Sequence, residues 1–521
     1  MSRPNFLFFI TDQQRADYLG CAGHPIVKTP NIDGLAAHGT RFDRFYVASP
    51  VCMPNRASLL TGRFPSTHGL RHNGCDLSIR ANTFTDVLRA GGYRTALIGK
   101  SHVQPMTGID SQKRYQPDEL GVIKEAWKAD DEADYDQEDP SRYASPEFFK
   151  IRTPYYGYDH VDMVTNHSDQ CNGHYYQWLK SKTNQADFWR DKANQLPHDY
   201  VCPQAVRTPI PEELYPTSFI RDRAIDYINA SKGDDQPFFA FVSFPDPHHP
   251  FTPPGKYWDM YSPEDFHPRL PYEAHKNPTP PMRWLHDHWT KGTRQAQTQE
   301  AFMANERETR EAMALSCGMI TMIDDAIGEV INALKAAGKY ENTVIVFNSD
   351  HGDYLGDFNL MLKGAVMLDS INNVSMIWSD PADRTARVSH ALSSTIDLAP
   401  SIIERAGLKH YWGIQGKSLL GNVAGSHDLR DELVIEYEDT QPRMGFEKSA
   451  VVRTLITADH RLTLYKGMPW GELYDRRNDP DDTHNVWDDP AYAGVRAELT
   501  ERLVHELMEN VDKSPHARRR A

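Results

Sequence analysis

Short, continuous apolar runs recur along the first four-fifths of the chain, and helical patterns separate them. Runs at 6–10, 93–98, 237–244 and 343–347 have the length and the aromatic or branched composition of strands buried on both faces. Further apolar segments lie at 40–47 and 374–378, and amphipathic helical patterns lie at 32–38, 83–90, 218–230, 309–337 and 394–406. This alternation predicts an α/β fold with a large, mostly parallel sheet sandwiched by helices.

The pattern changes after about residue 420. Short alternating segments at 433–437, 450–457 and 462–465 are typical of strands, and the last two are close enough to form a hairpin. An amphipathic helix is expected at 495–508. We therefore expect a large α/β domain over residues 1–420 and a C-terminal subdomain over residues 421–521, with a small antiparallel sheet, a closing helix and a tail.

Two long stretches lack a regular pattern. Residues 104–217 are polar, aromatic and interrupted by prolines, with an acidic run around 130–139, and residues 257–298 are rich in proline and aromatic residues. We expect loops in both, the first shaping a ligand pocket and its acidic run forming a solvated face.

Polar side chains follow the predicted strands directly. The four strands lead to Asp12 and Gln13, to Lys100 and His102, to His248 and His249, and to Asp350 and His351. Carboxyl ends of parallel strands meet at one edge of a sheet, where open α/β sheets bind ligands. Two carboxylates, an amide oxygen and an imidazole form a plausible site for a divalent metal, made by Asp12, Gln13, Asp350 and His351. Taken singly, each could equally be a strand-end cap or a turn residue.

The segment around Cys52 carries a second signal. Apolar spacing from Ala57 to Leu60 predicts a short helix that Gly62 ends, which places Cys52 at the helix N-terminus. Unpaired amide groups and the helix dipole favour an anion there. Arg56, one turn further on, can direct its donors to the same point. An isolated Cys-x-x-x-Arg pattern is more often a buried structural cysteine beside a surface arginine.

Charge and cysteine usage narrow the classes of function. Lys plus Arg is 57 against 72 for Asp plus Glu, a net charge of -15, which argues against nucleic-acid or anionic-membrane partners. We expect no secretory leader and no membrane span, hence a soluble cytoplasmic protein. The six cysteines show no CxxC spacing and are expected to be reduced thiols.

The cysteine segment and several others resemble a known family. The core Cys52-Met53-Pro54-Asn55-Arg56, followed by 57–63, is similar to the signature of the type I sulfatases of the alkaline phosphatase superfamily. Segments 4–15, 28–33, 99–102, 247–251, 349–352, 473–475 and 478–480, together with Lys363, fit the same family, whereas about 106–217 shows no resemblance. The resemblance implies an alkaline phosphatase-like catalytic domain with a small C-terminal antiparallel sheet.

The resemblance also implies a chemistry. A formylglycine-generating enzyme would convert Cys52 to 3-oxoalanine (formylglycine), and one hydroxyl of the hydrated aldehyde would bind the metal and attack the sulfur of a small-molecule sulfate ester. The second hydroxyl would then lose its proton, and cleavage of the C–O bond would expel sulfate. Many sulfatases hold calcium, with asparagine and aspartate where this chain has His351 and Gln13. Calcium or manganese is therefore expected.

The resemblance implies a role for each matching residue. Asp350 would take the nucleophile's proton, His248 and Lys363 would act on the leaving oxygen, His102 would deprotonate the second hydroxyl, and Arg56 and Lys100 would hold the diol and sulfate oxygens. His248 is preferred to His249 because the family pattern is Pro-His-x-Pro-Phe. Asn73 either touches the substrate or is a turn residue before Gly74.

Several readings remain open. Phosphonate monoester hydrolases and phosphodiesterases of the same superfamily share these motifs but have tyrosine and threonine where this chain has Lys100 and His102. The Lys-x-His pair is the arrangement of the sulfatases, so the resemblance favours a sulfatase, with side activity on phosphonates and phosphodiesters. Choline sulfatases share the Asp-Gln pair, which leaves an alkyl sulfate open. A non-catalytic anion-binding relative would need a lost catalytic position, and none is lost. The basic tail at 518–520 suggests a homo-oligomer, most simply a dimer.

Overall fold

The computed structural model describes residues 3–109, 126, 128, 133–145, 147–296, 299–426 and 428–519. Within these residues a nine-stranded sheet has the order β12-β2-β11-β9-β1-β7-β4-β5-β6. Its central strands are parallel: β9 (Thr343–Ser349), β1 (Asn5–Thr11), β7 (Phe238–Ser243), β4 (Arg94–Lys100) and β5 (His160–Thr165). The outer strands are β12 (Arg387–Ser389), β2 (Thr40–Phe42), β11 (Met376–Ser379) and β6 (Asn172–Gly173), of which β11 and β6 run antiparallel to their neighbours. The prediction of a mostly parallel α/β sheet is confirmed.

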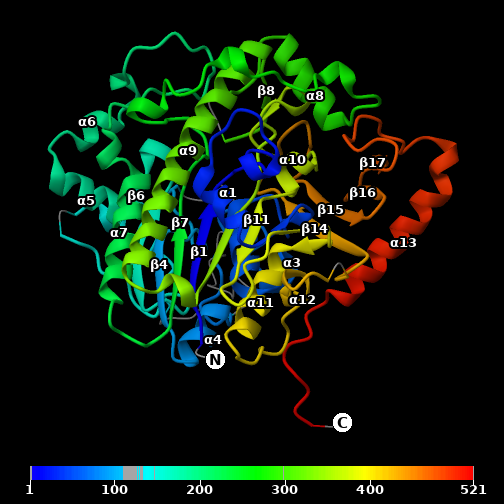
Figure 1. Ribbon diagram of the computed structural model, residues 1–521. Coiled ribbons are helices and arrows are strands. Elements are labelled where there is room, and N and C mark those ends of the chain that lie inside the picture. The colour runs from blue at the N-terminus through cyan, green and yellow to red at the C-terminus, as the bar shows by residue number, and fades with distance from the viewer. Residues whose placement is uncertain are drawn as a thin grey trace, which may run out of the picture.

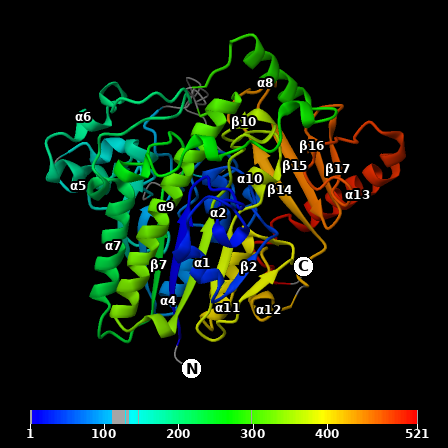
Figure 2. The same cartoon turned by 45° about the horizontal axis from the view of Figure 1, so that its top comes forward.

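Helices cover both faces of this sheet (Figures 1 and 2). Along β1, Phe6, Phe8 and Ile10 enter one core and Leu7 and Phe9 enter the other, as the two-residue period of a strand requires. The first core includes α2 (Cys52–Thr61), α4 (Phe84–Ala90) and α11 (Leu398–Arg405), and the second includes α1 (Pro30–Ala36), α5 (His174–Lys182), α7 (Pro216–Ala230) and α9 (Glu306–Ala336). Burial of each large apolar side chain contributes about 1.5–3 kcal/mol, so both cores fix the strand register strongly.

Helix α9 is the longest helix and begins at a capping box. The Asn305 side chain accepts the Glu308 N–H, and the Glu308 carboxylate accepts the Asn305 N–H. After α9 ends, Gly338 takes a left-handed backbone with φ 70°. The prediction of a long helix over 309–337 is confirmed to within three residues. No helix of the described chain is both long and apolar enough to cross a membrane.

A separate antiparallel sheet follows near the C-terminus, drawn in orange to red in Figure 1. It consists of β14 (Glu432–Glu438), β15 (Val451–Thr457), β16 (His460–Tyr465) and β17 (Gly471–Asp475). Helix α13 (Ala493–Glu509) packs Leu499 and Leu503 against the inner side chains of this sheet. The small sheet and its hairpin are confirmed, whereas β17 was not predicted as a strand.

The prediction that residues 104–217 form one loop is wrong. Strand β5 extends the large sheet beside β4, and β6, α5 and α6 (Ala186–Arg190) follow it. Its first residues, His160, Val161 and Asp162, are not fully buried, so no continuous apolar run marks the strand. Within the acidic run, Glu138 is fully buried rather than solvated, and residues 130–132 lie outside the described residues.

Two smaller predictions also need correction. The stretch 257–298 contains helix α8 (Pro280–Thr290), which begins with two prolines, residues tolerated in a first turn because their missing N–H groups have no intrahelical partner there. The predicted strand at 40–47 divides into β2 and β3 (Phe45–Tyr46), and β3 pairs outside the large sheet.

Candidate active site

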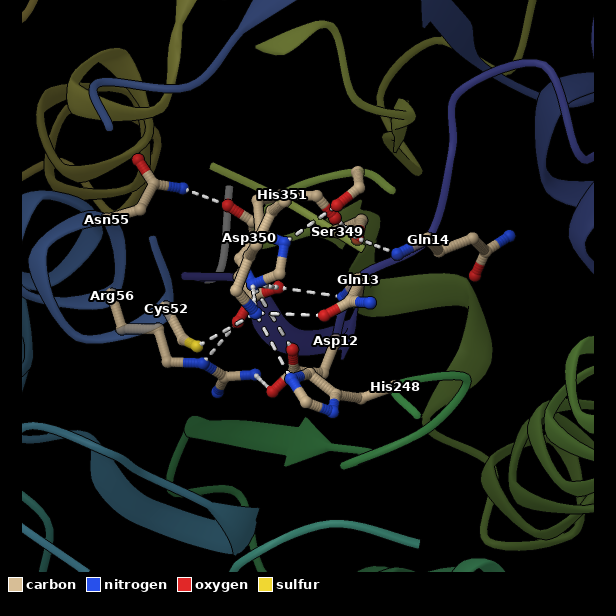
Figure 3. A network of polar contacts seen from close by, with 12 residues as sticks. Asp12, Gln13, Gln14, Cys52, Asn55, Arg56, His248, Ser349, Asp350 and His351 are labelled. Carbon is tan, nitrogen blue, oxygen red and sulfur yellow. Dashed lines mark hydrogen bonds and ion pairs between the residues drawn. The ribbon is translucent and has the colours of Figure 1, made fainter. Parts of the chain in front are cut away.

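The strands β1, β4, β7 and β9 are parallel and lie together in the middle of the large sheet, so their carboxyl ends meet at one edge. Figure 3 shows Asp12, His248 and Asp350 close together at this point, beside Cys52 and Arg56. The four strands bring Asp12, Lys100, His248 and Asp350 into one buried cluster, beside the N-terminus of α2. The Lys100 ammonium group bonds the Asp12 carboxylate directly. The strand-end argument therefore predicted correctly where these side chains gather.

Helix α2 places Cys52 at its first position. Val51 before it has an extended backbone (φ -131°, ψ 135°), and Gly62 ends the helix in a left-handed conformation with φ 63°. Asn55 in the first turn joins the neighbouring loops, because its Oδ1 accepts the Ala48 N–H at 2.9 Å and its Nδ2 donates to the Asp350 carbonyl oxygen. Sequence analysis did not assign this role to Asn55.

The surroundings of Cys52 favour negative charge. Its side chain is buried, and the Lys363 Nζ lies 3.7 Å from its Sγ. Burial by itself raises the pKa of the Cys52 thiol, but Lys363 and Lys100, with hydrogen bonds from His102 and His167, hold that pKa well below its usual value. The charges around position 52 therefore favour an anionic group there.

Arg56 contacts protein groups through most of its donors. Its Nε donates to Asp350 Oδ2 at 2.7 Å, and its Nη1 donates to the Lys100 carbonyl oxygen at 3.0 Å and to Ser243 Oγ at 2.9 Å. Its Nη2 lies 3.6 Å from Asp12 Oδ2 and has no hydrogen-bond partner among the described residues. Nη2 is thus the donor of Arg56 left for a ligand.

Four side chains offer ligand atoms within 4.8 Å of one another, namely Asp12, Cys52, Asp350 and His351. The His351 Nε2 lies 3.4 Å from Asp12 Oδ1 and 3.6 Å from Asp350 Oδ1. Asp12 Oδ1 is buried and accepts no hydrogen bond from any residue in the described ranges. Burial raises the pKa of Asp12, but Lys100, His248 and Arg56 hold it well below its usual value, so Asp12 is ionised. A buried carboxylate oxygen without a donor, beside an imidazole and a second carboxylate, fits a divalent cation.

Gln13 lies at the edge of this set and has a left-handed backbone with φ 64°. Its Oε1 accepts from the Lys363 Nζ at 2.9 Å, and its Nε2 donates to Asp353 Oδ2 at 2.5 Å and lies 3.0 Å from His249 Nδ1. The Lys363 Nζ is also 3.1 Å from His351 Nε2. The ammonium group therefore lies among the acceptors proposed for the metal, a position that suits a cation.

A family model for sulfatases matches residues 4–137 and 149–408, most of the chain. The chain belongs to the sulfatase family. A second model, the C-terminal part of N-sulphoglucosamine sulphohydrolase, matches residues 356–509. These matches cover both the large sheet and the small C-terminal sheet.

Individual relatives of this sulfatase span nearly the whole chain. It is 29% identical to the uncharacterized sulfatase YidJ of Escherichia coli K12 over 506 residues, covering 97% of this chain and 87% of the relative. It is 27% identical to the multifunctional alkaline phosphatase superfamily protein PehA of Trinickia caryophylli over 543 residues, covering 99% and 97%. The crystal structure of phosphonate monoester hydrolase of Agrobacterium radiobacter shares the fold, with a TM-score of 0.76, 24% identity and coverage of 98% and 97%.

The two adjacent histidines of the sulfatase site face different groups. His248 Nε2 lies 3.1 Å from the Lys363 Nζ, whereas His249 Nδ1 faces Gln13. His248 Nδ1 donates to the His249 carbonyl oxygen at 2.6 Å, which leaves Nε2 directed at Lys363. The geometry therefore places His248, the residue selected from the Pro-His-x-Pro-Phe pattern, beside Lys363.

His102 and Asn73 both lie near the start of α2, where His102 interacts with Cys52 and Asn73 with Met53. His102 has φ 58°, and its N–H donates to Glu138 Oε2 at 2.8 Å. Burial and the nearby Lys100 lower the pKa of His102 to about 4, so the ring is neutral near neutral pH. Asn73 Oδ1 accepts the Met53 N–H at 3.3 Å, so part of this side chain caps the first turn of α2.

Sequence analysis missed His167, which follows β5. Its Nε2 lies 2.7 Å from the Lys100 Nζ, and its ring stacks on His248 with 3.5 Å between centroids. The signal that finds the other residues, a polar side chain after a buried strand, also applies to His167. It could not be used because the half-polar strand β5 was not predicted.

Proposed function

We propose that this protein hydrolyses sulfate monoesters, aryl sulfates among them, at position 52. The observation that carries this proposal is the arrangement around Cys52: a helix N-terminus, Lys100 and Lys363 surround a buried position that favours an anion. Membership of the sulfatase family supports the reaction class.

We assign one divalent ion, calcium or manganese, to Asp12, Gln13, Asp350 and His351, with residue 52 as a further ligand. When bound, such an ion supplies a Lewis acid that polarises the ester and stabilises an anionic nucleophile. This assignment is supported by Asp12 Oδ1, a buried carboxylate oxygen that accepts no hydrogen bond from the described residues. The His351 nitrogen favours manganese more than an all-oxygen set does.

A formylglycine-generating enzyme would convert Cys52 to formylglycine, whose aldehyde is hydrated to a diol. One hydroxyl of the diol is used for attack on sulfur and the other for release of sulfate. Asp350, held by Arg56 at 2.7 Å, takes the proton of the attacking hydroxyl. His102 takes the proton of the second hydroxyl, and its neutral ring suits that role.

The leaving oxygen is assigned to His248 and Lys363. Their Nε2 and Nζ atoms are 3.1 Å apart, so both can reach one oxygen atom. Lys100 and the free Nη2 of Arg56 hold the sulfate oxygens. Asn73 contributes a substrate contact through the part of its side chain that does not cap α2.

Mass spectrometry of the peptide that contains Cys52 tests this proposal. We expect formylglycine in the active protein, in proportion to the specific activity of each preparation. A preparation with full activity and only an unmodified thiol at Cys52 would overturn the proposed chemistry.

A second candidate function is phosphonate monoester and phosphodiester hydrolysis, because the motifs of this chain also resemble those of phosphonate monoester hydrolases and the enzyme of that name from Agrobacterium radiobacter shares the fold. Lys100 and His102, both buried beside Cys52, favour the sulfate ester. We expect a higher kcat/KM for nitrophenyl sulfate than for nitrophenyl phenylphosphonate on one preparation. A clear preference for the phosphonate would assign the chain to the second candidate, and turnover of choline sulfate alone would indicate an alkyl sulfatase.

We also keep the predictions of a homodimer and of a cytoplasmic location. The C-terminal tail contacts its own chain, because Trp412 Nε1 donates to the Lys513 carbonyl oxygen at 2.7 Å and Arg63 pairs with Asp512. The tail is thus held without a second subunit, and the dimer has to be tested independently of it. Light scattering on the full chain and on a chain truncated after Val511 does so, since a monomer in both cases ends the proposal.

A further inference from the structure

His167 and Ser168 make three separate connections to the site. Its Nε2 lies 2.7 Å from the Lys100 Nζ, and its ring is nearly parallel to that of His248, with an angle of 11° and 3.5 Å between centroids. The next residue, Ser168, donates from Oγ to the His248 carbonyl oxygen at 2.6 Å. Residues 167 and 168 thus hold both the ring and the backbone of His248.

The backbone around His167 is unusual. Asn166 has φ 66° and Ser168 has φ 51°, so two left-handed residues that are not glycine flank an extended histidine. Each such residue costs conformational free energy, and such conformations cluster at functional sites. The cost is offset here by contacts that direct His167 and Ser168 at one side chain, His248.

A second metal does not explain this corner of the site. Asp12, Cys52, His167 and His248 do offer ligand atoms within 4.8 Å of one another. However, the Lys100 ammonium group already bonds both Asp12 and His167. A divalent ion at the same point would meet that fixed positive charge, so the corner holds its own cation.

The His248 ring is fixed on several sides. It stacks on His167 and also on His249, at 4.1 Å between centroids, and its Nδ1 donates to the His249 carbonyl oxygen. Only its Nε2 edge faces the Lys363 Nζ, at 3.1 Å. A ring held in this way can exchange a proton with Lys363 or with the leaving oxygen only through Nε2 and along one direction, as acid–base catalysis requires of a positioned group.

We propose that His167 is a positioning residue that holds His248 in the orientation needed to act on the leaving oxygen, while its Nε2 accepts a hydrogen bond from Lys100. This inference rests on the proposed function, because it concerns the departure of the alcohol. The inference adds to the site a residue from the segment after β5, and it gives the His167 side chain two tasks, ring stacking on His248 and hydrogen bonding to Lys100.

Two substitutions separate those contributions. His167→Phe keeps a flat ring to stack on His248 but removes the acceptor for Lys100, and His167→Gln keeps a side-chain acceptor but removes the ring. We would measure kcat/KM for a series of aryl sulfates that differ in the pKa of the released phenol. The change of kcat/KM across the series shows how strongly the rate depends on the leaving group. We expect His167→Gln to lose at least about tenfold more on the poorest leaving group than on the best. His167→Phe should lose a similar factor on every ester.

The matched control is His160→Gln, because His160 lies at the start of β5, is exposed and pairs with Asp162. It should leave every rate unchanged. Ser168→Ala removes only the bond to the His248 carbonyl oxygen and should increase the leaving-group dependence less than His167→Gln does. His167→Gln is the deciding variant. If thermal unfolding shows that His167→Gln is not folded, Ser168→Ala becomes the deciding variant.

Equal losses across the series in the deciding variant, at wild-type thermal stability, would overturn the inference while leaving the proposed function intact. Should the wild type prefer phosphonate monoesters, the sulfate proposal fails, and the same comparison on aryl phosphonates tests His167. The metal-induced rise in melting temperature should match the wild type in all variants, because His167 is not assigned to the metal. Loss of that rise would show that His167 acts on the metal site instead, and would overturn the inference.

Discussion

Two of the buried clusters of charged side chains in the described part of the chain differ in how completely their carboxylate oxygens are bonded. In the small C-terminal sheet, Arg461 is fully buried between Asp482, at 2.8 Å from its Nε, and Glu472, at 2.5 Å from its Nη1. Arg476 adds a second guanidinium group to Asp482, and Tyr465 donates to the other oxygen of Glu472. Every oxygen of these two carboxylates accepts a hydrogen bond.

The cluster at the edge of the large sheet is bonded differently. Asp12 Oδ1 has no donor in the described part of the chain, although Asp12 Oδ2 is bonded by Lys100. The Lys363 ammonium group contacts Gln13, His248, His351 and Cys52, and no carboxylate of the described residues lies within 4 Å of it.

The comparison shows how a structural cluster differs from a binding site. The C-terminal cluster completes the bonding of its carboxylates with its own side chains, so its value lies in folding. The edge cluster leaves a carboxylate oxygen and an ammonium group to be matched by a cation and an anion from outside. Buried charge alone would not distinguish the two.

The largest expected effect is on the edge cluster. Asp12→Asn removes the charge that the metal needs at nearly the same shape, and we expect kcat/KM on nitrophenyl sulfate to fall by at least about 10³-fold, or about 4 kcal/mol. In the wild type, metal at 100 times its Kd should raise the free energy of unfolding by about 2.7 kcal/mol. Asp12→Asn should lose that rise. An equal metal response in both proteins would contradict the assignment of Asp12.

The C-terminal cluster should respond in stability and not in catalysis. Arg461→Met leaves Glu472 and Asp482 with fewer partners, and loss of one member of a buried ion cluster costs about 3–5 kcal/mol of the free energy of unfolding in urea. The kcat of the folded fraction should stay at the wild-type value. The control is Arg477→Met, which removes a half-exposed arginine paired with Asp475 and should cost much less stability than Arg461→Met, because water screens an exposed pair. Equal costs for both variants would refute the distinction.

The same comparison shows what the sequence could predict. Strand β1 and helix α9 were predicted because residues 6–10 of β1 form a continuous apolar run and the apolar stripe of α9 is long. Asp12, Lys100, His248 and Asp350 were placed because each follows such a strand. Strand β5 was not predicted, because an outer strand with polar residues on its exposed part carries no continuous pattern.

Partners within the site were beyond the sequence for a different reason. The bond from Arg56 to Asp350 joins residues 294 positions apart, and the bond from Glu138 to the N–H of His102 depends on a loop without any pattern. Family resemblance located the cysteine motif but contained nothing on His167. Charge pairs such as Arg461 with Glu472 are equally invisible, since their spacing does not differ from that of surface residues.

A smaller effect is expected from Lys363, whose removal leaves no carboxylate unpaired within the described chain. Lys363→Ala should therefore leave the free energy of unfolding nearly unchanged, unlike Arg461→Met. Its proposed work on the leaving oxygen predicts a loss of about 10²-fold in kcat/KM for aryl sulfates with poor leaving groups and a much smaller loss for good ones. Equal losses across phenols of differing pKa would remove Lys363 from that role.

The smallest expected effect is a change in how much folding stability the protein loses on acidification. Burial raises the pKa of Asp482, but Arg461 and Arg476 hold that pKa below its usual value. The ionised form therefore stabilises the fold, and its contribution is complete above the unfolded-state pKa of about 3.9 and is lost as the pH falls through the lower folded-state value. Urea unfolding at pH 5 and pH 3 should show a smaller acid-induced loss for Asp482→Asn than for the wild type. The control Asp226→Asn, at an exposed carboxylate on α7, should behave as the wild type does. An equal loss in Asp482→Asn and the wild type would mean that the C-terminal cluster does not contribute to acid sensitivity.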